Sequence, residues 1–183
     1  MEVTATAIPD VKIVKPKRFG DHRGFFSETF STRSFAEAGL PSLFVQDNHS
    51  LSRPKGTVRG LHFQLAPFAQ DKLVRVVRGA ILDVAVDLRR DSPSFGRWVG
   101  AVLSAENGEQ LLIPIGFAHA FCTLEADTEV LYKVTNFYSP QHDRGLLWND
   151  PDLAIDWPLA EGDAVLSDKD RVHPRLRDLP PCF

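Results

Sequence analysis

Alternating apolar and polar positions dominate the chain from about residue 43 onward. The clearest apolar runs are separated by Gly, Pro, Asn or Asp and cover residues 72–77 (KLVRVV), 80–88 (AILDVAVDL), 98–104, 110–115, 119–124 and 129–138. Alternation with a period of two predicts β-strands that each bury one face. No helical pattern of about 10–15 residues separates these runs, so a parallel α/β sheet is not expected. The pattern predicts an all-β sandwich or jelly roll.

Other segments complete this prediction. Residues 31–39 (STRSFAEAG) predict one short helix, which Ser or Thr caps and Gly39 ends. Residues 9–28 predict two strands joined by the turn GDHRG, and the Asn-Gly pair within 106–109 predicts a β-hairpin. The proline-rich stretch after residue 139 predicts a tail that packs across the barrel. We therefore expect a single jelly-roll domain over residues 1–183.

Composition excludes several classes of protein. The chain has 183 residues, 43% of them hydrophobic and 25% charged, with a formal net charge of −3. These values predict no broad basic surface, and hence no nucleic-acid partner. No apolar stretch reaches membrane-spanning length, and no signal peptide is visible, so we expect no membrane association. Cys122 and Cys182 form no CxxC pair, which favours a reduced, cytoplasmic protein without a cysteine-based metal site.

One predicted strand is unusually polar. The segment VRGLHFQ carries Arg59, His62 and Gln64 among apolar residues. Strict alternation places His62 and Arg59 on opposite faces, whereas a β-bulge at Gly60 would turn them to the same side. The sequence leaves both arrangements open.

Two further polar residues lie on apolar strand faces. Lys72 shares a face with Val74, and Tyr132 shares a face with Val130. Taken singly, a histidine, a tyrosine or a lysine in a strand is most often structural. Together they provide a candidate base, a candidate acid and a fixed cation, which an enzyme needs to remove a proton next to a carbonyl group.

A metal site is the alternative interpretation of His62 and His119. Residues 114–119 (PIGFAH) resemble the second motif of the cupins, a jelly-roll superfamily in which many members bind a metal. A metal-binding cupin also needs closely spaced histidines and a downstream glutamate, but here Gln64 follows His62 and no Glu precedes Gly79. Only His62 and His119 remain, fewer than the roughly three protein ligands of a catalytic metal. We expect a cupin-type fold without a metal site.

The chain resembles the dTDP-4-dehydrorhamnose 3,5-epimerase family over nearly its whole length. The matching segments follow in order: DHRGFFSETF (21–30), FVQDNHS (44–50), GTVRGLHFQ (56–64), AQDKLVRVVRGAILDVAVDLRRDSPSFGRW (69–98), IPIGFAHAF (113–121), EVLYKVTNFYSP (129–140), GLLWNDPDLAIDWP (145–158) and LSDKD (166–170). The resemblance implies a cupin-type jelly roll, with one or two short helices and a loop-rich tail, that acts as a homodimer without metal or organic cofactor. It also implies a dTDP-linked 4-keto-6-deoxyhexose substrate that is inverted at C3 and C5.

The resemblance further assigns the catalytic roles. His62 is expected to remove the protons next to the ketone, and Asp170 to orient its imidazole. Lys72 is expected to stabilise the enolate oxygen, and Tyr132 to return a proton from the opposite face.

By the same resemblance, further residues are expected to contact the nucleotide sugar together with Lys72: Arg23, Glu28, Gln46, Asp47, Asn48, Arg59, His119, Asp143 and Lys169. Phe26 and Tyr138 are candidates to flank the thymine ring. Several relatives exchange their N-terminal regions, so Arg23 and Glu28 are candidates for the partner's site. The family often has Glu where this chain has Asp143, and this shorter carboxylate puts direct ligand contact there in question.

Two other functions remain open from the sequence. An epimerase that inverts only C3 or only C5 shares the same motifs. A non-catalytic sugar-nucleotide-binding cupin would be expected to lack one of His62, Lys72, Tyr132 and Asp170, and all four are present.

Overall fold

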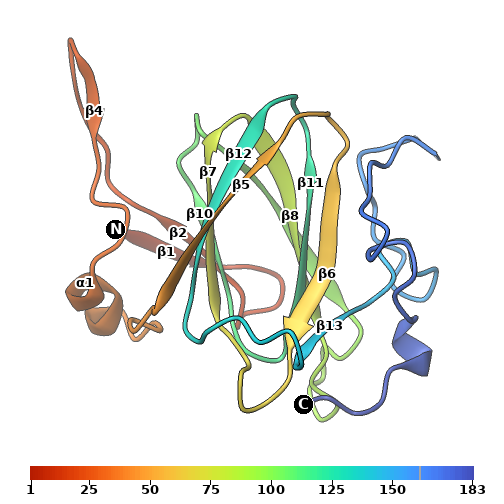
Figure 1. Ribbon diagram of the computed structural model, residues 1–183. Helices are drawn as coiled ribbons and strands as arrows, with labels where there is room; N and C mark the ends of the chain where they lie inside the picture. Colours follow the sequence, from red (N-terminus) through yellow and green to blue (C-terminus); the bar gives the residue numbers. More distant parts are fainter. Residues whose placement is uncertain (161) are drawn as a thin grey trace.

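The chain folds into two antiparallel β-sheets packed face to face, as the computed structural model of residues 1–160 and 162–183 describes it (Figure 1). The six-stranded sheet has the order β1 (Glu2–Ala5), β2 (Lys12–Lys15), β10 (Gln110–Ile113), β7 (Lys72–Arg78), β12 (Thr128–Val134) and β5 (Gln46–Ser52). The five-stranded sheet has the order β13 (Asp143–Gly145), β6 (Val58–Gln64), β11 (Phe117–Thr123), β8 (Ala80–Asp87) and β9 (Trp98–Ser104). The predicted all-β jelly roll is confirmed.

Three apolar clusters hold these layers together. Between the sheets, Val74 and Val130 of one sheet pack with Ala85 and Phe121 of the other. On the outer face of the six-stranded sheet, helix α1 (Thr32–Glu37) places Phe35 in a cluster with strand residues. The backbone N–H of Ser34 donates to the Ser31 hydroxyl, and Gly39 follows the helix with φ +68°, so the predicted helix is confirmed.

The C-terminal tail covers the outer face of the five-stranded sheet, opposite α1 (Figure 1). Leu146, Leu153 and Leu179 of this tail pack in one cluster with Leu61 and Phe63 of β6. A short helix, η1 (Leu176–Asp178), lies in the same segment. The tail therefore packs across the barrel, as its loop-rich sequence predicts. Among the described residues, no helix is long and apolar enough to cross a membrane.

An N-terminal hairpin stands away from the two sheets (Figure 1). It consists of β3 (Phe19–Asp21) and β4 (Gly24–Phe26), which pair around the expected GDHRG turn. Phe19, Phe25 and Phe26 are exposed. The predicted second strand is shorter than its apolar pattern suggests: it ends at Phe26, and Phe30 packs instead with Phe35 of α1.

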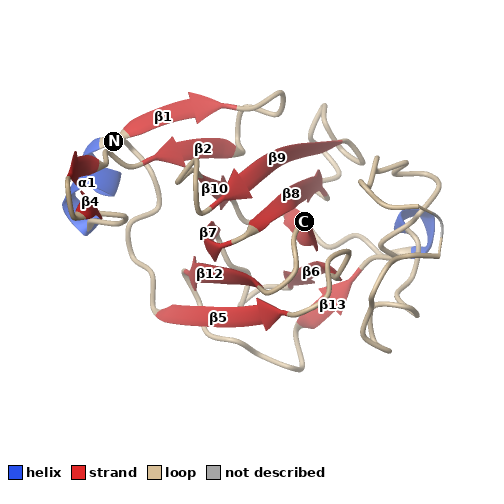
Figure 2. Cartoon of the chain, turned by 90° about the horizontal axis from the view of Figure 1, so that it is seen from above, coloured by secondary structure: helices blue, strands red, loops and turns tan. Residues whose placement is uncertain are grey.

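The Asn-Gly pair does not form the predicted hairpin. It connects β9 to β10, which belong to different sheets, as the view along the barrel shows (Figure 2). The Asn107 side chain accepts hydrogen bonds from the backbone N–H groups of Ser104 (3.1 Å) and Glu109 (3.0 Å). A side chain bonded in this way to the backbone stabilises a tight turn, whether the turn joins two strands of one sheet or strands of two sheets. The Asn-Gly signal therefore predicted the turn but not which strands it connects.

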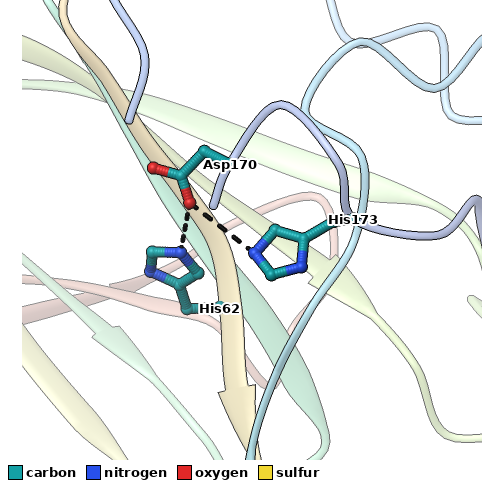
Figure 3. A group of neighbouring side chains, drawn as sticks. All are labelled: His62, Asp170 and His173. Atoms are coloured by element: carbon teal, nitrogen blue, oxygen red, sulfur yellow. Dashed lines mark hydrogen bonds and ion pairs between the residues drawn. The ribbon is translucent and has the colours of Figure 1, made fainter. Parts of the chain in front are cut away.

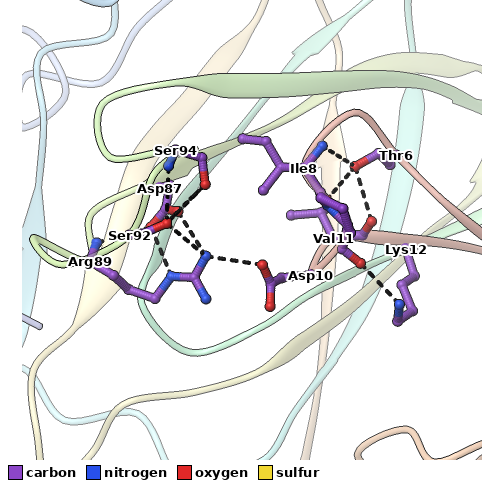
Figure 4. Close-up of polar contacts among 10 residues, drawn as sticks. Thr6, Ile8, Asp10, Val11, Lys12, Asp87, Arg89, Ser92 and Ser94 are labelled. Carbon is purple, nitrogen blue, oxygen red and sulfur yellow. Dashed lines mark hydrogen bonds and ion pairs between the residues drawn. The ribbon is translucent and has the colours of Figure 1, made fainter.

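Arg89 links the buried carboxylate of Asp87 to the N-terminal segment at the end of the barrel (Figure 4). The Arg89 guanidinium donates to both carboxylate oxygens of Asp87, at 2.9 and 2.7 Å, and also reaches Asp10 at 3.1 Å. The Ser92 and Ser94 hydroxyls each donate to Asp87 at 2.6 Å. Burial alone would raise the pKa of Asp87, but these donors hold it far below its usual range.

Candidate active site

A cavity of about 720 Å³ opens between the two sheets, and both β5, at the edge of the six-stranded sheet, and β6 of the five-stranded sheet line it. Side chains from β5, β6, β7, β11 and β12 line it, together with tail residues 165–170. A second lobe of about 390 Å³ continues toward Tyr138 and Asp143. His62, Lys72, Tyr132 and Lys169 line both lobes, so the two form one cleft.

His62 and Asp170 form the central polar pair of this cleft (Figure 3). The His62 Nε2 and Asp170 Oδ1 atoms are 2.6 Å apart, and the Ser167 hydroxyl donates to Asp170 Oδ2 at 2.8 Å. A carboxylate acceptor favours the tautomer with hydrogen on Nε2, which leaves the lone pair on Nδ1. Burial alone would raise the pKa of Asp170, but the hydrogen bond and charge of His62, together with Ser167 and His173, lower it overall. Asp170 is therefore a carboxylate that orients the ring.

A β-bulge turns His62 and Arg59 into the same cavity. The pairing of β6 with β11 matches His62 to His119 but Arg59 to Phe121, so one extra residue lies in β6 between them. Gly60 occupies this position with φ +122°, and a Cβ there would lie 2.5 Å from the His119 carbonyl oxygen. Only glycine fits this close approach. The question that the sequence leaves open is thus answered in favour of the bulge.

The tail delivers Asp170 by pairing with the start of β6. Val165 forms a parallel bridge with Thr57, and its carbonyl accepts the N–H of Val58 at 3.0 Å. Asp170 follows five positions later and is 3% exposed. The active-site carboxylate is therefore held by backbone pairing, although 108 residues separate it from His62.

Lys72 lies behind His62 on β7. Its ammonium donates to the His62 carbonyl at 3.3 Å. Burial lowers the pKa of Lys72 to about 8, against the attraction of Asp143 and Asp83. The side chain therefore remains mostly cationic at neutral pH and places a poorly solvated positive charge beside the cavity.

Tyr132 enters the cavity from β12, and its ring packs against the core between the sheets. Burial raises its pKa, although Arg59 opposes that shift, so the phenol keeps its proton. Arg59 is held by Ser52 at 3.1 Å and by the Leu51 carbonyl at 3.2 Å. A protonated phenol and a fixed guanidinium therefore share this side of the cleft.

A second histidine–carboxylate pair lies deeper in the barrel. His119 Nε2 is 2.6 Å from Asp83 Oδ1, and Asp83 is fully buried. Burial lowers the pKa of His119 despite the charge of Asp83. His62 and His119 are register partners, but each directs Nε2 at its own carboxylate rather than toward a shared ligand. His62 and His119 therefore do not converge on one metal ion, and no catalytic step is assigned to a metal.

The second lobe brings together six of the predicted binding residues: Gln46, Asn48, Lys72, Tyr138, Asp143 and Lys169. Lys169 forms an ion pair with Asp143, and the Tyr138 hydroxyl donates to the same carboxylate at 3.4 Å. Burial would lower the pKa of Lys169, but Asp143 outweighs it and raises the pKa. Asp143 thus positions two side chains that line the lobe.

Four predicted binding residues lie away from this cleft. Asp47 alternates with Gln46 and Asn48 on β5 and faces the other side, where it pairs with Lys133 at 2.9 Å. Arg23, Phe26 and Glu28 lie on or just after the exposed hairpin, and Arg23 pairs with Asp21. The described chain therefore does not bring these four residues to the cavity.

Three residues that support the site are not among those predicted from the sequence: Ser167, His173 and Asp83. Ser167 and His173 flank Asp170 in the segment SDKDRVH, and both contact its carboxylate. Asp83 lies in the apolar run of β8, and an acid within a fully buried strand is itself a signal that a buried partner exists.

Taken together, these groups are suited to proton transfer. A polarised imidazole with a free lone pair, a cation beside it and a protonated phenol surround one cavity. This combination can remove a proton next to a carbonyl, stabilise the resulting enolate and return a proton.

Comparison with known proteins places the chain in a family. The family model described as dTDP-4-dehydrorhamnose 3,5-epimerase matches residues 5–178. The chain belongs to the dTDP-4-dehydrorhamnose 3,5-epimerase family. A family member from Sinorhizobium fredii, described as dTDP-4-dehydrorhamnose 3,5-epimerase, is 55% identical over 100% of this chain and 93% of its own length.

Solved structures of this epimerase family share the fold. The Bacillus anthracis dTDP-4-dehydrorhamnose 3,5-epimerase, solved with TDP and PPi bound, is 53% identical with a TM-score of 0.92, covering 95% of this chain and 98% of its own. The Legionella pneumophila dTDP-6-deoxy-D-glucose-3,5-epimerase, in complex with dTDP-4-keto-L-rhamnose, is 46% identical with a TM-score of 0.93, covering 98% and 94%. The resemblance read from the sequence motifs is confirmed at the level of the family.

Proposed function

We propose that the protein is a cofactor-independent epimerase that inverts C3 and C5 of dTDP-4-dehydro-6-deoxy-D-glucose to give dTDP-4-dehydro-L-rhamnose. The observation that carries this proposal is the single cleft shared by the His62–Asp170 pair, Lys72 and Tyr132. Family membership supplies the substrate class, and the cleft supplies groups for each step of the chemistry.

The proposed mechanism follows from the acidity of carbons next to a ketone. Loss of the proton on C3 or C5 gives an enolate, and His62 Nδ1 takes that proton while Asp170 stabilises the imidazolium. The Lys72 ammonium stabilises the enolate oxygen. Tyr132, a phenol that burial keeps protonated, returns a proton from the opposite face and so inverts the carbon.

The remaining residues are proposed to bind the nucleotide. Arg59 and Lys169 supply positive charge to the diphosphate, and Gln46, Asn48, His119 and Tyr138 contact the sugar and base from the cleft walls. We propose a cytoplasmic homodimer of one-domain subunits, in which the exposed hairpin carries Arg23, Phe26 and Glu28 to the partner's cleft. The exposure of Phe19, Phe25 and Phe26 supports such a partner.

The deciding experiment uses dTDP-4-keto-6-deoxy-D-glucose in deuterated buffer, followed by NMR with and without a 4-keto-reductase. We expect deuterium at both C3 and C5, and L-rhamnose after reduction. Deuterium at one carbon only would identify a mono-epimerase, and no deuterium would favour a binding protein.

The Tyr132→Phe variant separates the two proton transfers. We expect it to exchange hydrogen at C3 or C5 with solvent while forming little inverted product, because His62 is intact and the opposite-face acid is gone. Equal loss of exchange and inversion would contradict the proposed role of Tyr132.

A further inference from the structure

The C-terminal tail brings a second histidine to the active-site carboxylate (Figure 3). His173 Nε2 lies 3.7 Å from Asp170 Oδ1, the oxygen that also contacts His62. One ligand atom from each of His62, Asp170 and His173 lies within 4.8 Å of the other two. Two imidazoles and a carboxylate are the ligand set of many three-ligand zinc sites.

His173 has an unmet hydrogen-bonding requirement at this point. Its Nε2 atom is buried and has no hydrogen-bond partner among the described residues. An unpaired buried nitrogen is costly, and an ion or a water is the usual remedy. A neutral imidazole offers one ring-nitrogen lone pair to a metal ion, so an ion bound here would satisfy this nitrogen.

The surroundings hold His173 in place. Its ring packs directly on Gly145 of β13, where a Cβ would collide with the imidazole. It also lies edge-on to His62, with ring centroids 5.7 Å apart. Ser167 anchors the second oxygen of Asp170, as outer hydrogen bonds commonly orient metal-binding carboxylates.

The spacing suits a small divalent ion. Ligand atoms about 2.0–2.1 Å from a tetrahedral zinc lie about 3.4 Å apart. The two measured separations, 2.6 Å from His62 to Asp170 and 3.7 Å from His173 to Asp170, lie on either side of this value. The 720 Å³ cavity that His62 and Asp170 line offers an entry path and room for a water as the fourth ligand.

We propose that His62, Asp170 and His173 form an inhibitory site for a borderline-soft divalent cation such as Zn²⁺. To bind the ion, His62 must release the proton on Nε2. The neutral ring then carries its proton on Nδ1, so no lone pair faces the cavity, and Asp170 is diverted to the metal. Ion binding is independent of the proposed function, whereas the inhibition rests on the proposed role of His62 as base.

The test begins with chelator-treated protein without substrate. Zn²⁺ uptake is measured by calorimetry, and Co²⁺ uptake by its visible absorption. We expect one ion per chain, and no comparable uptake of Mg²⁺, which prefers oxygen ligands. His173→Phe should weaken Zn²⁺ binding at least about tenfold, whereas His49→Gln, at an exposed strand histidine, should leave it unchanged.

NMR of the histidine side chains makes the test independent of any variant. Zn²⁺ should shift the ring nitrogen signals of His62 and His173 but not those of His119. In the exchange assay, Zn²⁺ should inhibit wild-type protein reversibly, and His173→Phe should need at least about tenfold more Zn²⁺ relative to its own uninhibited rate.

Absence of ion uptake, or equal Zn²⁺ affinity in wild type and His173→Phe, would overturn the site. Ion binding at His62 without inhibition would overturn the inhibitory role and contradict His62 as the base. An inactive protein that still binds Zn²⁺ through these residues would instead refute the proposed function alone.

Discussion

The two histidine–carboxylate pairs of the barrel have the same hydrogen-bond length but different surroundings. In both, Nε2 lies 2.6 Å from a carboxylate oxygen, and the two histidines are register partners on β6 and β11. The His62 side chain is 32% exposed and its carboxylate comes from the tail. The His119 side chain is 8% exposed and its carboxylate comes from the adjacent strand β8.

We expect this difference to separate a group that exchanges protons from one that holds a fixed hydrogen bond. Burial lowers the pKa of His119, which keeps the ring neutral, so it can orient a ligand but is poorly suited to take up a proton. His62 faces the open cavity with Asp170 ready to stabilise the charged ring. Hydrogen-bond length alone therefore does not identify the catalytic base.

The strongest test of this contrast replaces each histidine. His62→Ala should reduce hydrogen exchange at C3 and C5 by about 10³–10⁴-fold, near the upper end of what a general base supplies. His119→Ala should raise KM more than it lowers kcat, because we propose that the ring contacts the ligand without taking a proton. Steady-state kinetics and NMR exchange measure both, and equal kcat losses would refute the distinction.

Replacing Asp170 should likewise lower kcat more than replacing Asp83. Asp170→Asn should lower kcat by about 10²–10³-fold, because an amide can donate to Nε2 and force the proton onto Nδ1. Asp83→Asn should lower kcat by less than about tenfold. If Asp83→Asn lowered kcat as much as Asp170→Asn, the His119–Asp83 pair would also take part in proton transfer.

Lys72, which donates to the His62 carbonyl, is expected to set the alkaline limit of activity. Its pKa of about 8 means that the ammonium is present below this pH and is lost as the pH rises through it. We expect kcat to fall about tenfold per pH unit well above 8, since the neutral amine no longer stabilises the enolate. The raised pKa of Tyr132 keeps that phenol protonated in this range.

Lys72→Arg is the matched variant for this limit. Arginine stays charged at all accessible pH values, so the variant should lose the alkaline limb while its activity at neutral pH falls. A pH profile with the limb still near 8 would assign it to another group.

The smallest expected effect is a loss of folding stability when the His119–Asp83 pair is weakened. Asp83→Asn should lower the free energy of unfolding by about 1–3 kcal/mol, because a buried hydrogen bond to a charged acceptor is weakened. Urea denaturation measures this loss. Ser50→Ala, which removes a buried hydroxyl without a partner among the described residues, is the control and should change stability by less than about 1 kcal/mol.

The sequence was informative where the pattern is local. Period-two alternation predicted the strands, and Ser31 with Gly39 predicted the helix limits, because each depends on neighbours in sequence. The Asn107–Gly108 turn shows the limit of this reasoning. The turn forms as predicted, but whether it joins strands of one sheet or two depends on long-range packing.

Three residues of the candidate site could be predicted because they too follow a local pattern. His62, Lys72 and Tyr132 are polar residues on apolar strand faces, which alternation reveals. That Gly60 turns Arg59 toward the cavity could not be predicted without the register between β6 and β11. The contact of His173 with Asp170 could not be predicted because it depends on how the tail packs. Asp170 itself entered only through family resemblance, since no local pattern links a tail carboxylate to a strand histidine.

The docking of the tail on β6 has a consequence for biosynthesis. During translation, every described strand emerges before Asp170, so a chain cut between Gly145 and Asp170 keeps the strand residues and His62 but not the partner of its imidazole. Such a product would also lack Leu153 and Leu179, which pack against β6. The last segment to be synthesised thus supplies both the apolar cover of the five-stranded sheet and the carboxylate that contacts His62.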